Sequence, residues 1–146
     1  MKNTCIMKRF TAIAAIVLST PVFAQQETTI HPPAAAAAAF SKAHPGIKGT
    51  WESEGKDYEV NFREKGAGMS CVLTAGGTII ETETGIKAEA LPDAARTYLQ
   101  QHYPGQKIKD AARIEKANGT IEYEAGIGNK DILFNEQGTF LKVAKD

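Results

Sequence analysis

The sequence predicts an α+β protein in which two tandem units, each a helix followed by four antiparallel strands, share one sheet with both helices on one face. Two observations lead to this prediction. A set of Pro, apolar and Gly positions recurs in the same order about 60 residues later. The segments after each copy of the helix alternate polar and apolar residues between turn-forming residues. The chain has 146 residues, of which 42% are hydrophobic and 23% are charged, which suits one globular domain.

Residues 1–24 have the features of an export signal. Two basic residues precede an apolar run over residues 10–18, and Val22 and Ala24 supply small side chains where signal peptidase requires them. The run is far shorter than the roughly 20 residues of a membrane-spanning helix. We therefore predict no membrane insertion and a mature chain that begins at Gln25, in the periplasm or secreted.

The mature chain would be mildly acidic and free of internal disulfides. Loss of the three basic residues of the signal leaves 14 basic and 17 acidic side chains, a net charge of −3. Without a basic stripe, such a surface does not bind nucleic acid. Cys71 would be the one remaining cysteine, and its inward strand position makes it a core residue.

The first unit covers residues 33–84. Residues 25–32 are polar and form a flexible leader before it. A helix is expected at about 33–43, where Pro33 suits the first turn and Pro45-Gly46 ends the helix. Strands are expected at about 47–53, 56–64, 69–74 and 78–84.

The second unit covers residues 91–146 and completes one domain over 33–146. Pro92, Leu99 and Pro104-Gly105 repeat the spacing of the first helix, so a second helix is expected at about 92–103. Strands are expected at about 107–117, 120–128, 130–135 and 139–144.

Hairpin lengths predict which strand positions face the helices. Two-residue loops at 54–55 and 118–119 and four-residue turns at 75–78 and 136–139 each pair one apolar residue with another. The predicted pairs are Trp51 with Tyr58, Leu73 with Ile80, Ile114 with Tyr123, and Phe134 with Leu141. The predicted core face comprises Trp51, Tyr58, Val60, Phe62, Cys71, Leu73, Ile80, Ile114, Tyr123, Ala125, Ile127, Ile132, Phe134 and Leu141.

The doubled pattern of Pro, Phe, Pro-Gly, Trp, Tyr-Glu-Val-x-Phe at 58–62 and Gly-Thr-Ile-Ile at 77–80 resembles the PepSY-like family of exported bacterial proteins. That family is beta-lactamase-inhibitor-like in fold, and the resemblance covers nearly all of the mature chain. It implies the tandem fold described above. The second unit departs from the pattern with Ile114 in place of Trp51, and Gly76 stands where an acidic turn residue is expected. The resemblance transfers no inhibitory contact residue to this chain.

The sequence offers no catalytic, metal or cofactor constellation. His31 lies in the leader, and His44 and His102 lie at helix ends, where imidazoles interact favourably with free carbonyls. Cys71 and one of these histidines could form a nucleophile pair, but a buried thiol is inert. We therefore predict that the protein is not an enzyme and has no cofactor.

The same registers place apolar side chains on the face away from the helices. Val72, Ile79, Leu133 and Phe140 take outward positions, with Glu81 and Lys142 at the rim of the cluster. The alternative is that these are ordinary strand residues, or that the leader covers them. The outward positions of the second strand of each unit are polar and predict a solvated surface: Asp57, Glu59, Asn61, Arg63, Glu122 and Glu124.

These features predict a non-enzymatic exported binding module, inhibitor-like toward a protein partner or self-associating through the open sheet face. The alternative is a periplasmic carrier or sensor for a small ligand or metal ion. That alternative requires a concave pocket or a cluster of His and carboxylate side chains.

Overall fold

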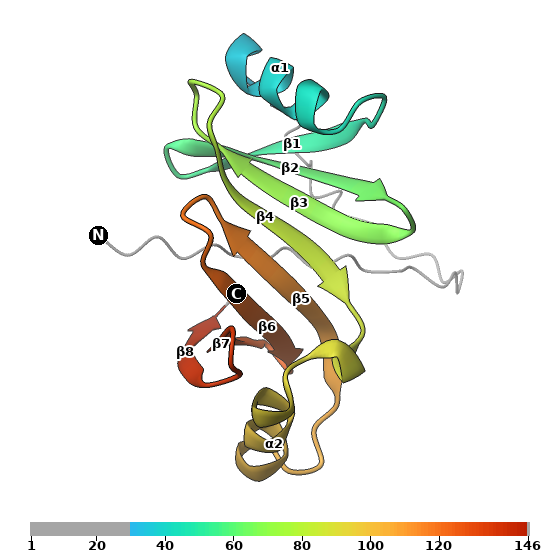
Figure 1. The fold of residues 1–146 in the computed structure, drawn as a ribbon, viewed down its shortest axis with the longest axis vertical. Helices are drawn as coiled ribbons and strands as arrows, with labels where there is room; N and C mark the ends of the chain where they lie inside the picture. Colours follow the sequence, from blue (N-terminus) through green and yellow to red (C-terminus); the bar gives the residue numbers. More distant parts are fainter. Residues whose placement is uncertain (1–29, 146) are drawn as a thin grey trace, which may run out of the picture.

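The computed structural model describes residues 30–145, which form one eight-stranded antiparallel sheet with two α-helices (Figure 1). The strands follow one another in the sheet in chain order. The expected export signal lies outside the described residues, as does most of the expected leader. The elements are α1 (Ala34–Ala43), β1 (Gly49–Glu54), β2 (Asp57–Glu64), β3 (Ala67–Leu73), β4 (Ile79–Ile86), the 3-10 turn η1 (Ala88–Ala90), α2 (Asp93–His102), β5 (Ile108–Lys116), β6 (Ile121–Ile127), β7 (Lys130–Asn135) and β8 (Phe140–Lys145).

Both helices begin and end where the sequence predicts. Pro33 and Pro92 precede them with φ of −54° and −52°, values that the proline ring fixes in advance. Each helix ends in a turn whose glycine, Gly46 or Gly105, has a positive φ. The Pro and Pro-Gly signals therefore set the helix boundaries.

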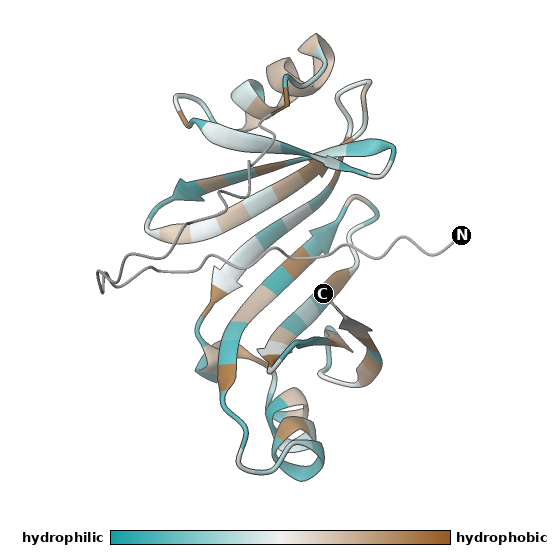
Figure 2. Ribbon diagram, turned by 180° about the vertical axis from the view of Figure 1, so that it is seen from behind, coloured by the Kyte–Doolittle hydropathy of each residue, from teal (hydrophilic) through white to brown (hydrophobic). Residues whose placement is uncertain are grey.

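The two helices pack on the same face of the sheet, at opposite ends (Figure 1). Cys71 pairs with Thr82, and Ile86 pairs with Ala111, so alternate positions along β4 connect the inward residues of both halves. Bands of hydrophilic and hydrophobic residues alternate along the strands, as this two-sided arrangement requires (Figure 2). The first core comprises Ala36, Phe40, Trp51, Val60, Phe62, Cys71 and Leu73, and the second comprises Leu91, Ala95, Leu99, Ala111, Ala125, Ile127, Ile132 and Phe134.

Ile30, within the expected leader, contacts the first core. Its N–H donates to the carbonyl of Trp51 at 3.4 Å, and its side chain packs against the core under α1. This part of the expected leader is therefore held against β1.

The β1–β2 hairpin differs from the predicted register by two residues. Glu54 pairs with Asp57, so Trp51 lies opposite Val60 and not opposite Tyr58. A shift of two keeps every side chain on its predicted face. Trp51 is accordingly buried in the first core.

The predicted registers of the other three hairpins were wrong by one residue, and the reason is the same in each. The hairpins after β3, β5 and β7 have three-residue loops that end in Gly77, Gly119 and Gly138, each with φ between 82° and 85°. A glycine in the left-handed region at the last loop position is the usual form of a three-residue hairpin loop. The loops are therefore one residue away from their predicted lengths.

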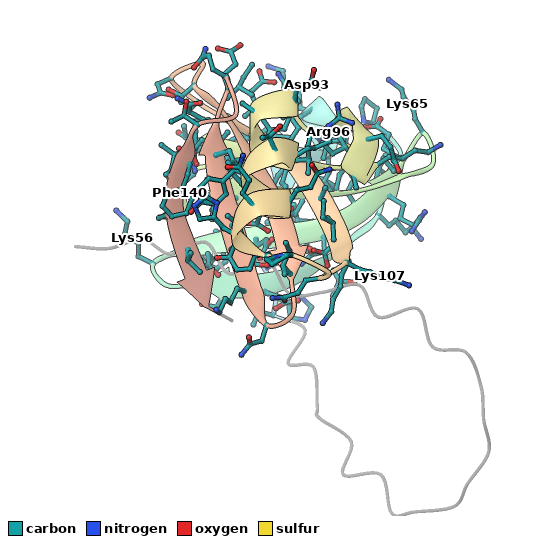
Figure 3. The ribbon with its side chains drawn as sticks, turned by 90° about the horizontal axis from the view of Figure 1, so that it is seen from below. Lys56, Lys65, Asp93, Arg96, Lys107 and Phe140 are labelled. Atoms are coloured by element: carbon teal, nitrogen blue, oxygen red, sulfur yellow. The ribbon has the colours of Figure 1, made fainter. Side chains whose placement is uncertain are left out.

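A one-residue shift exchanges faces. Leu73 pairs with Ile79, and Phe134 pairs with Phe140, so Ile79 and Phe140 face the helices and were wrongly predicted to face outward. Ile79 packs against the first core. Phe140 stacks on Tyr98 of α2 at 4.9 Å between ring centroids, which places it against the second core (Figure 3).

An irregularity after the β3–β4 loop and another after the β7–β8 loop restore the predicted register further along these strands. Ile80 and Leu141 are the extra residues, and beyond them Val72 pairs with Glu81 and Leu133 with Lys142 as predicted. Ile80 and Leu141 therefore leave the predicted core pairs, and Leu141 is 45% exposed.

The β5–β6 pair contains no such correction near its loop. Arg113, not Ile114, lies opposite Tyr123, and Ile114 pairs with Glu122 on the other face. Ile114 was therefore wrongly predicted to lie under the helices.

Candidate functional site on the open face

The face of the sheet opposite the helices is hollowed into a cavity of about 420 Å³. Its wall includes the β1–β2 turn at Lys56 and Asp57, and also Lys142 and Ala144 of β8. In a flat sheet β2 and β8 would lie roughly 29 Å apart, because neighbouring strands are about 4.8 Å apart. The sheet must therefore curl strongly to bring both ends to one cavity.

The structure brings four of the six predicted contact residues to this cavity. Val72, Leu133, Glu81 and Lys142 line it, while Ile79 and Phe140 lie on the other face. Val72 and Leu133 are each only 6% exposed, so they form a floor and not a protruding patch. Ile80 and Ile114, which were predicted to be core residues, complete the apolar lining.

Buried carboxyl groups surround this apolar floor. Glu59 on β2, Glu83 on β4 and Glu124 on β6 are 4%, 6% and 3% exposed. Asp57, Glu59 and Glu124 face outward as predicted, but the prediction that they are solvated was wrong, because the curl of the sheet covers them. Asp57, Glu81 and Asp131 are also buried at this face.

Register explains how the acids come together. Glu59 pairs with Val72, and Val72 pairs with Glu81; Glu124 pairs with Leu133. Each of these acids therefore has an apolar neighbour across the ladder, which removes water from beside the carboxyl group.

Burial raises the pKa of all three glutamates above the ordinary value of 4.5. Desolvation is the largest cause in each, and it raises the pKa of Glu59 to about 7, of Glu83 to about 8 and of Glu124 to about 9. Neighbouring carboxylates raise these pKa values further, whereas a hydrogen bond from Ser70 lowers that of Glu59. At pH 7 Glu83 and Glu124 are therefore mainly protonated and neutral.

Glycine allows one more acid to join the group. Gly126 on β6 pairs with Asp110 on β5, and a Cβ atom at Gly126 would lie 1.7 Å from Asp110 Oδ1. The Asp110 carboxylate therefore lies across the backbone of Gly126, where any larger residue would displace it.

Two carboxyl oxygens at the cavity lack a hydrogen-bond partner within the described part of the chain. Lys116 Nζ lies 2.5 Å from Glu81 Oε2 and 3.7 Å from Glu122 Oε2. Glu81 Oε1 and Glu124 Oε1 are buried and have no such partner. A buried polar atom without a partner is costly, so these two atoms are the natural points at which a ligand could bind.

A separate group of polar side chains lies under α1. Cys71 Sγ lies 3.7 Å from His44 Nε2, and His44 Nδ1 lies 2.9 Å from Glu64 Oε2. Because a carboxylate only accepts, Nδ1–H donates to Glu64, and in the neutral imidazole Nε2 then accepts from the Cys71 thiol. A contact of Cys71 with a histidine was considered from the sequence. The contact of Glu64 with His44 was missed, and only the tertiary fold reveals it.

This order of groups matches a nucleophile, a base and an orienting acid, but the thiol is not accessible. Cys71 is 0% exposed, and burial raises its pKa, so it stays a neutral thiol. His102 acts as expected of a histidine at a helix end, because its Nδ1–H donates to the carbonyl of Tyr98 at 2.9 Å.

A second hollow of about 390 Å³ lies beside α2. Leu99, Tyr103, Ile108 and Ile127 make it largely apolar, and its one arginine, Arg96, forms an ion pair with Asp93. It offers fewer polar groups to a ligand than the open-face cavity.

Residues 30–145 contain neither a candidate metal cluster nor a candidate membrane span. No three His, Cys, Asp or Glu side chains in that range are arranged to hold a metal ion. No helix in it has the length and apolar character needed to span a bilayer.

Solved bacterial structures share this fold. A protein of Bacteroides eggerthii described as periplasmic has a TM-score of 0.71 at 15% identity, with 79% of this chain and 89% of that chain covered. A DUF2874 family protein of Bacteroides uniformis has a TM-score of 0.70 at 16% identity, covering 79% and 90%. A BLIP-like protein of Bacteroides fragilis has a TM-score of 0.63 at 23% identity, covering 80% and 87%.

No family model matches the sequence, and no curated protein matches it. The structural likeness at these identities concerns the fold. The chain therefore has a fold that a BLIP-like protein and a DUF2874 family protein also have.

Proposed function

We propose that this protein is a non-enzymatic binding module, exported to the periplasm, that binds a protein partner through the open face of its sheet. The observation that carries the proposal is the curled open face, where an apolar floor is ringed by buried carboxyl groups, and where Glu81 and Glu124 each have one oxygen without a partner. The sequence of residues 1–24 and the periplasmic description of a protein with the same fold support the location.

Binding explains the face better than catalysis does. Covalent catalysis requires an accessible nucleophile beside a base. Cys71 is the thiol with such a neighbour, and it is buried on the opposite face. Among the described residues, the cavity itself holds acids and lysines but no histidine, cysteine or serine.

We also propose that the chain is PepSY-like and consists of two tandem units. Each helix is followed by four strands, and corresponding turn glycines contact corresponding helices. A Cβ atom at Gly77 would lie 2.5 Å from the carbonyl of Ala35 in α1, and one at Gly138 would lie 2.8 Å from the amide nitrogen of Ala95 in α2. These matching contacts support the repeat in the sequence.

Site-specific photocrosslinking in living cells tests the binding proposal. A photoreactive amino acid is placed at Ile80 or Lys142 on the open face, or at Lys107 between α2 and β5 as a matched control. We expect one protein partner to cross-link from positions 80 and 142 and not from 107. Cross-linking from 107 alone, or equally from all three positions, would contradict the proposal.

The same experiment separates the remaining possibilities. A cross-linked dimer of the protein itself would identify self-association through this face. The cavity volume also lies within the range of about 300 to 1,000 Å³ that is typical of small-molecule sites. A small-ligand carrier or sensor would therefore be favoured if no protein cross-links from either open-face position.

A further inference from the structure

We propose that the open-face cavity receives the guanidinium group of an arginine side chain from the partner protein, with Glu81 and Glu124 as the acids that bind it. This inference rests on the proposed function and specifies the chemistry of the partner. Three features of the cavity support it, namely the unpartnered oxygens, the apolar floor and the charges at the rim.

The unpartnered oxygens require a donor from outside the described chain. Glu124 lines the cavity and is only 3% exposed, and its Oε1 has no hydrogen-bond partner among the described residues. Glu81 uses Oε2 for Lys116 and also leaves Oε1 free. A guanidinium carries five N–H donors in a planar fork, so it can supply charge-assisted hydrogen bonds to such oxygens.

The floor favours arginine over a small hydrophilic cation. Val72, Ile114 and Leu133 offer apolar contact to the methylene stem while the charged end reaches the acids. Arginine is also more weakly hydrated than an ammonium group, so it enters buried sites at lower cost. Arginine is among the residues that contribute most to protein interfaces.

The lysines around the cavity do not prevent such binding. Lys116 is already neutralised by Glu81 and Glu122. Lys142 and Lys56 are exposed at the rim. They would pair with acidic residues on either side of the arginine, so we expect an arginine with acidic neighbours in the partner.

Binding of a cation should release protons. Glu124 faces Glu81 and Glu83 from β4, Asp110 from β5, Asp131 from β7 and Lys142 from β8. The pKa of Glu124 is about 9 without a cation, and a guanidinium beside it lowers that pKa, so we expect the affinity to increase with pH between 6 and 8.

The test uses N-acetylarginine methylamide as the probe and its citrulline analogue as a matched control. Citrulline has nearly the same shape but carries no charge. Binding is measured by ¹H–¹⁵N NMR titration of the protein at pH 7.5 and at pH 6. We expect the arginine probe to change the chemical shifts of residues around the cavity and to bind more weakly at pH 6. The citrulline analogue should cause no comparable changes.

Variants identify the acids. Glu124→Gln and Glu81→Gln should each lower the affinity for the arginine probe by at least about tenfold, because each variant loses a charged hydrogen-bond acceptor. Glu136→Gln, in the exposed β7–β8 loop, should bind as the parent does. Dispersed spectra from the free variants show that they fold.

Equal binding of citrulline, shifts away from the cavity, or unchanged affinity of both variants would overturn the inference. Shifts at the cavity with CaCl₂ but not with the arginine probe would also overturn it. A partner that cross-links from position 142 while the arginine probe fails would overturn the inference alone. Probe binding without any protein cross-link would overturn the proposed protein partner and leave only the guanidinium site in place.

Discussion

Replacement of Glu124 with Gln should make the protein more stable at neutral pH. In the folded protein the carboxyl group is buried and its pKa is about 9, whereas an unfolded glutamate has a pKa near 4.5. Between these values the folded chain keeps a proton that the unfolded chain has lost. The free energy of unfolding must therefore decrease as the pH increases from about 4.5 toward 9.

The size of this effect follows from the pKa difference. One pH unit corresponds to about 1.4 kcal/mol for one group, so at pH 7 the ionisation of Glu124 in the unfolded chain costs about 3 kcal/mol of stability. Gln has nearly the same shape and does not ionise, so it removes this cost.

Urea unfolding at pH 5, 6, 7 and 8 measures the effect, with fluorescence of the buried Trp51 and circular dichroism as independent probes. We expect the free energy of unfolding of Glu124→Gln to exceed that of the parent by less than about 1 kcal/mol at pH 5 and by about 2 to 3 kcal/mol at pH 7. Glu136→Gln, on an exposed loop, should follow the parent at every pH. If the parent and Glu124→Gln show the same pH dependence, the carboxyl group is not protonated in the folded state and our account of the cavity fails.

Three further predictions concern the two faces and the turns. Phe140→Asp should lower the free energy of unfolding by more than about 3 kcal/mol, because Phe140 packs on α2. Leu141 is 45% exposed, so Leu141→Asp should lower it by less than about 1 kcal/mol. Equal losses in urea titrations would show that the two faces are misassigned. Gly77→Ala should destabilise the protein by at least about 2 kcal/mol more than Gly66→Ala. Both glycines have φ of 85°, but of the two only Gly77 would bring a Cβ atom against backbone atoms. A smaller difference in thermal unfolding would refute this close contact. Cys71 should react with a thiol reagent at pH 8 no faster than the protein unfolds, and a rapid reaction would contradict its burial.

The order and boundaries of the secondary structure were predictable because local chemistry determines them. Pro33 and Pro92 fix the start of each helix, and a Pro-Gly pair ends it. All eight strands lie within three residues of the predicted positions. These features depend on near neighbours in the chain, which the sequence displays directly.

Register was less predictable because one loop residue decides it. Gly77, Gly119 and Gly138 are each followed by Thr and each occupy the last position of a three-residue loop. That shared Gly-Thr pattern was the available signal for the three-residue loop. Without it, Ile79 and Phe140 were predicted on the wrong face.

The burial of the acids could not be predicted from alternation along the strands. Alternation places Glu59 and Glu124 on the open face, but it does not report whether that face is flat or curled. Curvature arises from the packing of the whole sheet, and here it brings the β1–β2 turn and β8 to one cavity. Solvated and buried carboxyl groups therefore look alike in this sequence.

The buried acids make folding less favourable at neutral pH, and this links the structure of the open face to its proposed use. Glu59, Glu83 and Glu124 must each be desolvated to fold, and Glu83 and Glu124 must also give up most of their ionisation. Glu124 Oε1 gains no hydrogen bond in return. Apolar residues of similar size would fill these positions at lower cost. A cationic partner group reverses the balance, because it pairs with the acids once they ionise and thereby recovers the free energy that burial consumes. The partner should accordingly stabilise the folded protein more at pH 8 than at pH 6, since at pH 8 fewer protons must be displaced.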